Sequence, residues 1–251
     1  VDGMLHVTGG GTLYVKDCTL DQQAAGAASG SCLSVDGATV VAHDSHIYNA
    51  NTTNADRFAI GVGSGSQVQL VDCSVRGEGG VHGEGGSVFS ARHTTITSSS
   101  ANAGSNAIRS EGTVSVSGGG VSSDDSSFVA VFMEGGGASL GLELINTLVS
   151  GKLHFDRGGA VSYQATLSSV AIKPEDITFL PSEADCNVQH GTAGESIAYW
   201  ADKEAHNSSF KAGAIPADSV QEALDRILNL SLGVVSLSDA YNGIVDHTKE
   251  P

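Results

Sequence analysis

The sequence predicts an all-β solenoid of about seven stacked coils, and three observations support this fold class. Short strand-like segments recur along the chain, with apolar anchors spaced 20 to 28 residues apart. A turn that contains glycine precedes most of them. The chain has 33 glycines and 40% apolar residues but only 5% aromatic residues, which suits a narrow core of small side chains. Repeats of this length are typical of coils that stack on one another.

Each coil is expected to place one anchor in an inner ladder of aliphatic side chains. In the first repeat, Leu13 and Val15 should point inward and Tyr14 outward, because side chains alternate across a strand. One coil cannot bury its apolar side alone, so neighbouring coils should pair at about 4.8 Å. The seven anchors expected to superpose are Leu13, Val40, Val68, Val88, Val114, Leu140 and Val161.

Two further strands are expected in most coils. One precedes each glycine turn, and its triplets are Leu5-His6-Val7, Leu33-Ser34-Val35, Ile60-Gly61-Val62, Val81-His82-Gly83, Ile108-Arg109-Ser110, Val131-Phe132-Met133 and Leu153-His154-Phe155. The other closes the coil with a third apolar anchor, and these anchors are Leu20, Ile47, Val75, Ile96, Val121 and Leu148. The pattern over residues 4 to 172 resembles the right-handed parallel β-helix of pectin-lyase-like proteins. Because the resemblance depends on repeat phase, it implies an architecture and not a chemistry.

The repeat ends near Ile172, so a β-helix domain is expected over residues 1–172. Residues 173–215 contain three of the four prolines and the single tryptophan, and we interpret them as a connector. Residues 216–251 begin with helix-start signals and carry one apolar stripe, which predicts a short amphipathic helix from Val220 to Leu230. The residues of that stripe are candidates for oligomerisation or module contacts: Val220, Leu224, Ile227 and Leu228.

This C-terminal stretch carries a second resemblance. The segment Val220-Gln221-Glu222-Ala223-Leu224-Asp225 is similar to a helix between modules of tailed-bacteriophage virion proteins, and Ser236-Leu237-Ser238-Asp239-Ala240-Tyr241 is similar to an element that commonly follows it. The resemblance implies a fibre, spike or surface decoration exposed on the virion. It also implies a homotrimer, contacts with other virion proteins, and attachment to a host-surface glycan.

Composition argues against several function classes. The formal net charge is −16, from 12 basic and 28 acidic residues, which disfavours nucleic-acid binding. No apolar run approaches about 18 residues, so no membrane insertion is expected. The four cysteines form no CxxC pair, and Cys18 and Cys73 share a repeat position roughly 10 Å apart, beyond disulfide reach. Neither a metal nor another cofactor is expected.

Outward positions of the first strands form two rows where chemistry could occur. The first row is His6, Ser34, Gly61, His82, Arg109, Phe132 and His154, and the second is Thr8, Asp36, Gly63, Glu84, Glu111, Glu134 and Asp156. Carboxylates about 5 Å apart can act as nucleophile and acid in retaining glycoside hydrolysis. Glu84, Glu111 and Glu134 are therefore the candidate catalytic residues.

Three interpretations of these rows stay open. An acid before a glycine turn is a common turn residue, and neighbouring cations can offset its charge. Alternatively, the rows form a glycan-binding surface, whose candidate residues are His82, Arg109, Phe132, His154 and Asp156. The third interpretation is a polysaccharide depolymerase. We favour a non-enzymatic virion protein over this enzyme and over a bacterial β-helix adhesin, which would require a secretion signal upstream and a membrane anchor downstream.

Overall fold

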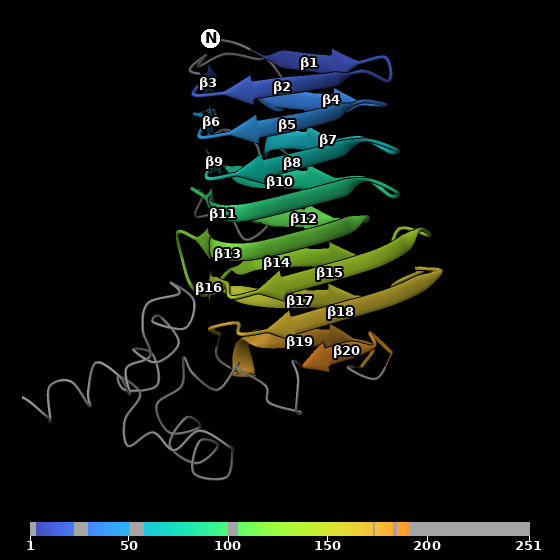
Figure 1. Ribbon diagram of the computed structural model, residues 1–251. Coiled ribbons are helices and arrows are strands. Elements are labelled where there is room, and N and C mark those ends of the chain that lie inside the picture. The colour runs from blue at the N-terminus through green and yellow to red at the C-terminus, as the bar shows by residue number, and fades with distance from the viewer. Residues whose placement is uncertain are drawn as a thin grey trace, which may run out of the picture.

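The computed structural model describes residues 4–22, 30–50, 58–99, 105–172, 174–182 and 185–190. Figure 1 shows strands stacked along one axis into an elongated column. Every strand pairing is parallel and joins strands from successive coils. The fold class expected from the sequence, an all-β parallel solenoid, is therefore confirmed.

Two long sheets make the walls of the solenoid. The first has eight strands in the order β1 (Leu5–Thr8), β4 (Leu33–Asp36), β7 (Phe58–Val62), β10 (Gly79–Gly83), β12 (Ile108–Ser110), β14 (Val129–Glu134), β17 (Lys152–Asp156) and β19 (Ile177–Leu180). The backbone of the second follows β2 (Thr12–Lys16), β5 (Thr39–His43), β8 (Gln67–Val71), β11 (Val88–Ser98), β13 (Thr113–Ser123), β15 (Ser139–Ile145), β18 (Ser162–Ser168) and β20 (Val188–His190).

Short third strands extend the second sheet round a corner. They are β3 (Thr19–Gln22), β6 (His46–Asn49), β9 (Ser74–Gly77) and β16 (Leu148–Ser150), and the long strands β11 and β13 continue the same ladder. A single turn of 3₁₀ helix, η1 (Pro174–Asp176), precedes β19. The ladders thus continue past Ile172, where the expected domain boundary lies, and take in part of the segment interpreted as a connector.

The core is a column of stacked aliphatic side chains between these walls. Leu13, Val40 and Val68 superpose as expected, and Val40 and Val68 are almost fully buried. The third anchors from Leu20 to Val121 also superpose. Burial of this ladder, at about 25 cal/mol per Å² of apolar surface, is the main force that holds successive coils together.

The expected register is wrong at four anchors. Phe89, not Val88, lies beside Val68, and Val88 is 39% exposed. Val114 pairs with Leu142 rather than with Leu140. Val161 is exposed and does not enter the core. Val121 pairs with Val149 rather than with Leu148. A one-residue shift moves a side chain to the opposite face. Where two apolar residues are adjacent, as in Val88-Phe89, alternation alone does not choose between them.

The corner between the second and third strands repeats one backbone turn from coil to coil. Its non-glycine residues with positive φ, between 49° and 55°, are Asp17, Asp44, Asp72, His93, Asn146 and Ser169. In most coils the next residue is Cys, Ser or Thr, whose side chain donates to the carbonyl two residues earlier, as Ser45 Oγ does to His43 O at 2.7 Å. Ser45 Oγ also accepts the Cys18 N–H at 3.2 Å, which links neighbouring coils.

This corner explains the shared repeat position of two cysteines. Cys18 and Cys73 occupy the place that Ser45 holds in the coil between them, and Thr94 holds it in the following coil. All four cysteines are free thiols, and Cys18 and Cys73 are not linked, as expected. Cys18 is exposed, while burial raises the pKa of Cys73.

Candidate functional site

The first of the two predicted rows is present on the outer face of the first sheet. His82 pairs with Arg109, Arg109 with Phe132, and Phe132 with His154. Above them the row continues through His6, Ser34 and Gly61. Because the inward neighbours of these residues are buried core residues, alternation directs the row itself outward. We call His82, Arg109, Phe132 and His154 the outer row.

Side chains of the outer row contact one another along the solenoid axis. His82 stacks on Phe58 with ring centroids 5.0 Å apart and an interplanar angle of 23°. Arg109 Cζ lies 5.7 Å from the centroid of the Phe132 ring, a cation–π geometry. His154 follows with its ring centroid 5.1 Å from that of Phe132. Arg109, Phe132 and His154 therefore form one continuous stack, and His82 stacks separately on Phe58.

Phe132 shows what this stacking means for ligands. Its ring contacts Arg109 in the coil before it and His154 in the coil after it. A sugar ring that stacks on an aromatic side chain needs one open ring face. Contacts of the outer row with a glycan would therefore use ring edges and polar atoms.

Three polar atoms of this surface are open for such contacts. His154 Nδ1 lies 2.6 Å from Thr178 Oγ1, and Asp156 Oδ1 accepts the Gly158 N–H at 2.9 Å. Within the described residues, no hydrogen bond occupies Nη1 of Arg109, Nε2 of His154 or Oδ2 of Asp156. These donors and acceptors suit the hydroxyl groups of a glycan.

The predicted carboxylate row lies beside the outer row. Glu134 pairs directly with Asp156. Glu84 and Glu111 follow Gly83 and Ser110, which pair with each other, so the two glutamates stand on adjacent coils. The structure thus brings the four predicted acids together on successive coils.

Each candidate catalytic glutamate has a different environment. Glu134 Oε2 accepts hydrogen bonds from Arg109 Nε at 2.9 Å and Nη2 at 2.7 Å. Glu84 Oε2 accepts the Ser64 N–H at 3.2 Å. The Glu111 backbone N–H donates to Gly83 O, but its carboxylate makes no hydrogen bond or ion pair with another described residue and lies so close over Gly136 that a Cβ there would clash with Oε2.

The environment of His82 shifts its pKa. Burial, and then the positive charge of Arg109, lower the pKa of His82 below its ordinary value of 6.5. The three glutamates Glu84, Glu111 and Glu134 act in the opposite direction. His82 is therefore neutral at neutral pH, and it supplies no positive charge to offset the carboxylates.

Two members of the site were missed in the sequence. Phe58 begins β7 directly after a polar stretch, outside the triplet Ile60-Gly61-Val62 that marked the strand, so its contact with His82 had no sequence signal. Thr178 lies in β19, within the expected connector. A longer search for alternation after Ile172 could have found β19 from Ile177 and Phe179.

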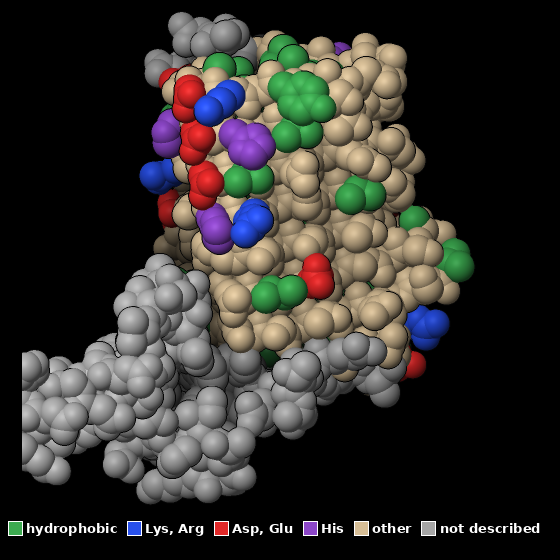
Figure 2. Space-filling view, in the orientation of Figure 1, with side chains coloured by type: hydrophobic (Ala, Val, Ile, Leu, Met, Phe, Trp, Pro, Cys, Tyr) green, Lys and Arg blue, Asp and Glu red, His purple; other side chains and the backbone are tan. Residues whose placement is uncertain are grey.

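The second sheet presents a different outer surface. Figure 2 shows that its centre is mostly uncharged, while acidic, basic and histidine side chains gather along one edge. This edge follows the corner with positive φ, where Asp72 Oδ1 lies 3.5 Å from His93 Nδ1. Tyr14 is the most exposed aromatic residue of the described chain, at 74%.

The described residues include no group of three or more His, Cys, Asp or Glu side chains placed to hold a metal ion. No helix among them is long and apolar enough to cross a membrane. The four candidate oligomerisation residues, Val220, Leu224, Ile227 and Leu228, lie outside the described part of the chain.

The fold and the rows define the class of protein as a parallel β-solenoid with an ordered outer ladder of side chains. The chain matches no protein-family model, no curated protein and no solved structure.

Proposed function

We propose that this chain is a non-enzymatic virion structural protein of a tailed bacteriophage, an exposed fibre, spike or decoration module that contributes to attachment to a host-surface glycan. The observation that carries the proposal is the outer row itself. It places ring edges, a guanidinium and carboxylates at regular intervals along a rigid ladder. Many weak contacts of this kind, multiplied by copy number, give useful avidity.

The carboxylate environments support a non-enzymatic role. Retaining glycoside hydrolysis requires two available carboxyl groups, one as nucleophile and one as acid. Arg109 engages Glu134, and a backbone N–H engages Glu84, which leaves Glu111 without such a partner among the described residues. Partners of this kind favour carboxylates that hold the turns in place over a nucleophile and acid pair.

Binding to polysaccharide tests the glycan part of the proposal. The full chain should bind one or more capsular polysaccharides or lipopolysaccharides on an array. Arg109→Gln and His154→Gln should each weaken that binding at least tenfold, because each removes an open polar atom of the outer row. Gln69→Ala, on the exposed face of the second sheet, is the control and should bind as the wild type does. Equal binding by all four proteins would place the contact elsewhere.

Immunogold electron microscopy tests the virion part. Antibodies against the full chain should label intact particles made by the genome that encodes it. Particles without label, together with label on the host envelope, would favour the adhesin instead.

A depolymerase is the alternative that one observation favours, since Glu84, Glu111 and Glu134 do lie on successive coils. Incubating the chain with a polysaccharide that it binds should produce no new reducing ends or unsaturated products. Cleavage that disappears in Glu111→Gln, while binding persists, would establish the enzyme and end the non-enzymatic proposal.

A further inference from the structure

The apolar core of the described solenoid is less covered at its two ends. Seven core residues are only partly buried, and all of them lie in the first or last coil: Leu5, Val7, Leu13, Val15, Ile177, Phe179 and Val188. An interior coil has a neighbour above and below, whereas an end coil has a paired strand on one side alone. Each end of the stack is therefore an apolar surface.

The C-terminal end of the described solenoid presents packed apolar side chains. β19 and β20 are the last strands of the two sheets, as Figure 1 shows. Phe179 stacks on Phe155 with centroids 5.1 Å apart and an interplanar angle of 13°. Ile177 and Val188 flank it in the same core.

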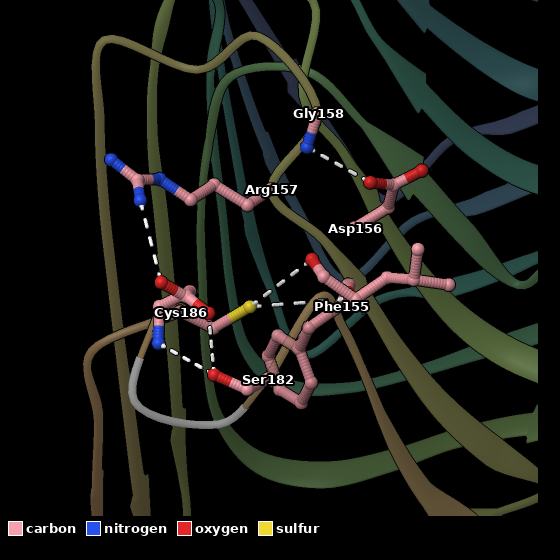
Figure 3. A network of polar contacts seen from close by, with 8 residues as sticks. Phe155, Asp156, Arg157, Gly158, Ser182 and Cys186 are labelled. Carbon is pink, nitrogen blue, oxygen red and sulfur yellow. Dashed lines mark hydrogen bonds and ion pairs between the residues drawn. The ribbon is translucent and has the colours of Figure 1, made fainter.

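Polar contacts hold this end in place. Figure 3 shows them around Cys186, whose thiol donates to the carbonyls of Phe155 and Leu180 at 4.0 and 3.8 Å. The Ser182 hydroxyl donates to Asp185, and the Cys186 N–H donates to the Ser182 carbonyl at 3.2 Å. Arg157 lies 3.8 Å from Asp185. These contacts tie Ser182, Asp185 and Cys186 to the preceding coil, and the C-terminal end of the described solenoid offers a surface for a further element.

The sequence after β20 offers one segment with matching chemistry. A terminal element of a solenoid needs an apolar inner face and a polar outer face. Val220 to Leu230 has its apolar stripe on one side of a helical projection and Glu222, Arg226 and Asn229 on the other. Eleven helical residues span roughly 16 Å, and a four-residue strand such as β19 spans roughly 13 Å.

We propose that Val220–Leu230 packs its apolar stripe across Ile177, Phe179 and Val188 of the same chain and caps the C-terminal end of the solenoid. The cap covers the partly buried core and turns a polar face outward. The stripe residues Leu224 and Ile227 make the central contacts.

Chain connectivity favours this intramolecular contact over association between copies. Residues 191 to 219 separate β20 from the stripe. A random-coil chain of that many residues would span roughly 30 Å on average, more than the end surface requires. Such a tether gives a local concentration on the order of millimolar, which exceeds the micromolar concentration of separate chains. The N-terminal end lies seven ladder steps away, roughly 34 Å, so the nearer end is favoured.

Hydrogen exchange on the full chain, read by mass spectrometry, tests the cap. Leu224→Glu places a charge in the stripe, and Asn229→Glu places the same charge on the polar face. Amides of β19 and β20 should exchange at least tenfold faster in Leu224→Glu than in the wild type. They should be unchanged in Asn229→Glu, and amides of β1 and β2 should be unchanged in both variants. Sedimentation velocity should show the wild-type association state in both.

Other results would overturn the cap. Unchanged exchange of β19 and β20 in Leu224→Glu would remove the proposed contact. Faster exchange confined to β1 and β2 would assign the stripe to the other end. Loss of a wild-type oligomer in Leu224→Glu, with β19 and β20 unaffected, would make the stripe an interface between copies. If far-UV circular dichroism shows that Leu224→Glu loses its sheet signal, Leu224→Ala replaces it, with an expected acceleration of about threefold at the same strands.

Discussion

Arg109 donates two hydrogen bonds to one oxygen of Glu134, from Nε at 2.9 Å and from Nη2 at 2.7 Å. The contact is diagonal across neighbouring coils, because Arg109 pairs in register with Phe132, two residues before Glu134. The same guanidinium lies over the Phe132 ring. One arginine therefore joins the aromatic and the carboxylate rows of the outer face.

Removing the carboxylate charge should weaken this link modestly. Both side chains are about one-third exposed, so Glu134→Gln is expected to lower the free energy of unfolding by about 0.5–1 kcal/mol. Urea denaturation measures the change, and 1 M salt should reduce it. Glu143→Gln is the control, because Glu143 has a serine and no arginine as its partner, and it should cost less. Equal losses in the two variants would contradict a specific contribution from Arg109.

The lowered pKa of His82 predicts that the stability of the protein depends on pH. Its pKa is lowered in the folded protein, so the unfolded chain binds the proton more tightly. The free energy of unfolding should therefore fall as the pH drops from about 6.5 through the lowered folded value, and level off below it. His82→Phe keeps a ring beside Phe58 and should flatten this part of the profile. Urea midpoints between pH 4 and 8 measure it.

His6→Phe makes the same substitution at an exposed position of the same face in the first coil, and it controls for the loss of a histidine and the gain of a phenylalanine ring. An unchanged slope in His82→Phe would show that other groups produce the pH dependence.

The corrected register predicts opposite behaviour at two adjacent residues. Phe89 is 1% exposed in the core, so Phe89→Ala should lower the free energy of unfolding by about 3–5 kcal/mol. Val88 is on the outer face, and Val88→Ala should cost less than about 1 kcal/mol. Chemical denaturation of both variants decides the register. A larger loss at Val88 than at Phe89 would restore the anchor expected from the repeat.

Ser45 tests the hydrogen-bonded corner. Its buried hydroxyl donates to His43 O and accepts the Cys18 N–H, so Ser45→Val leaves both groups without that partner. The expected loss is about 1–3 kcal/mol. Ser45→Thr has the same added size and keeps the hydroxyl, as Thr94 does naturally in the equivalent position, and should retain most of the stability. Similar thermal midpoints for Val and Thr would rule out the hydroxyl as the stabilising group.

Much of the fold follows from local pattern. Alternation places Leu13 inward and Tyr14 outward, and glycine turns mark where each coil changes direction. The rows His82–Arg109–Phe132–His154 and Glu84–Glu111–Glu134 follow from the same repeat, since equivalent positions of stacked coils must be neighbours. The predicted parts of the site are those that depend on periodicity alone.

The strand register and the side-chain contacts between coils could not be predicted from that pattern. Val88 and Phe89 are both apolar, and the choice between them depends on how each side chain fits against Val68 in the neighbouring coil. Phe58 contacts His82 only because two segments 24 positions apart meet at one coil boundary. The continuation of the ladders into β19 and β20 likewise depends on pairing with strands already in place.

By itself, the sequence determined that this protein stacks coils and which residue types form its outer rows, because a repeat imposes equivalent neighbours. Only the tertiary structure decided that Arg109 bonds to Glu134 and leaves Glu111 without such a partner among the described residues. Three glutamates stand at equivalent positions near one arginine. Because the repeat spaces them equally, side-chain geometry and the glycine turn beneath Glu111 determine which glutamate bonds to Arg109.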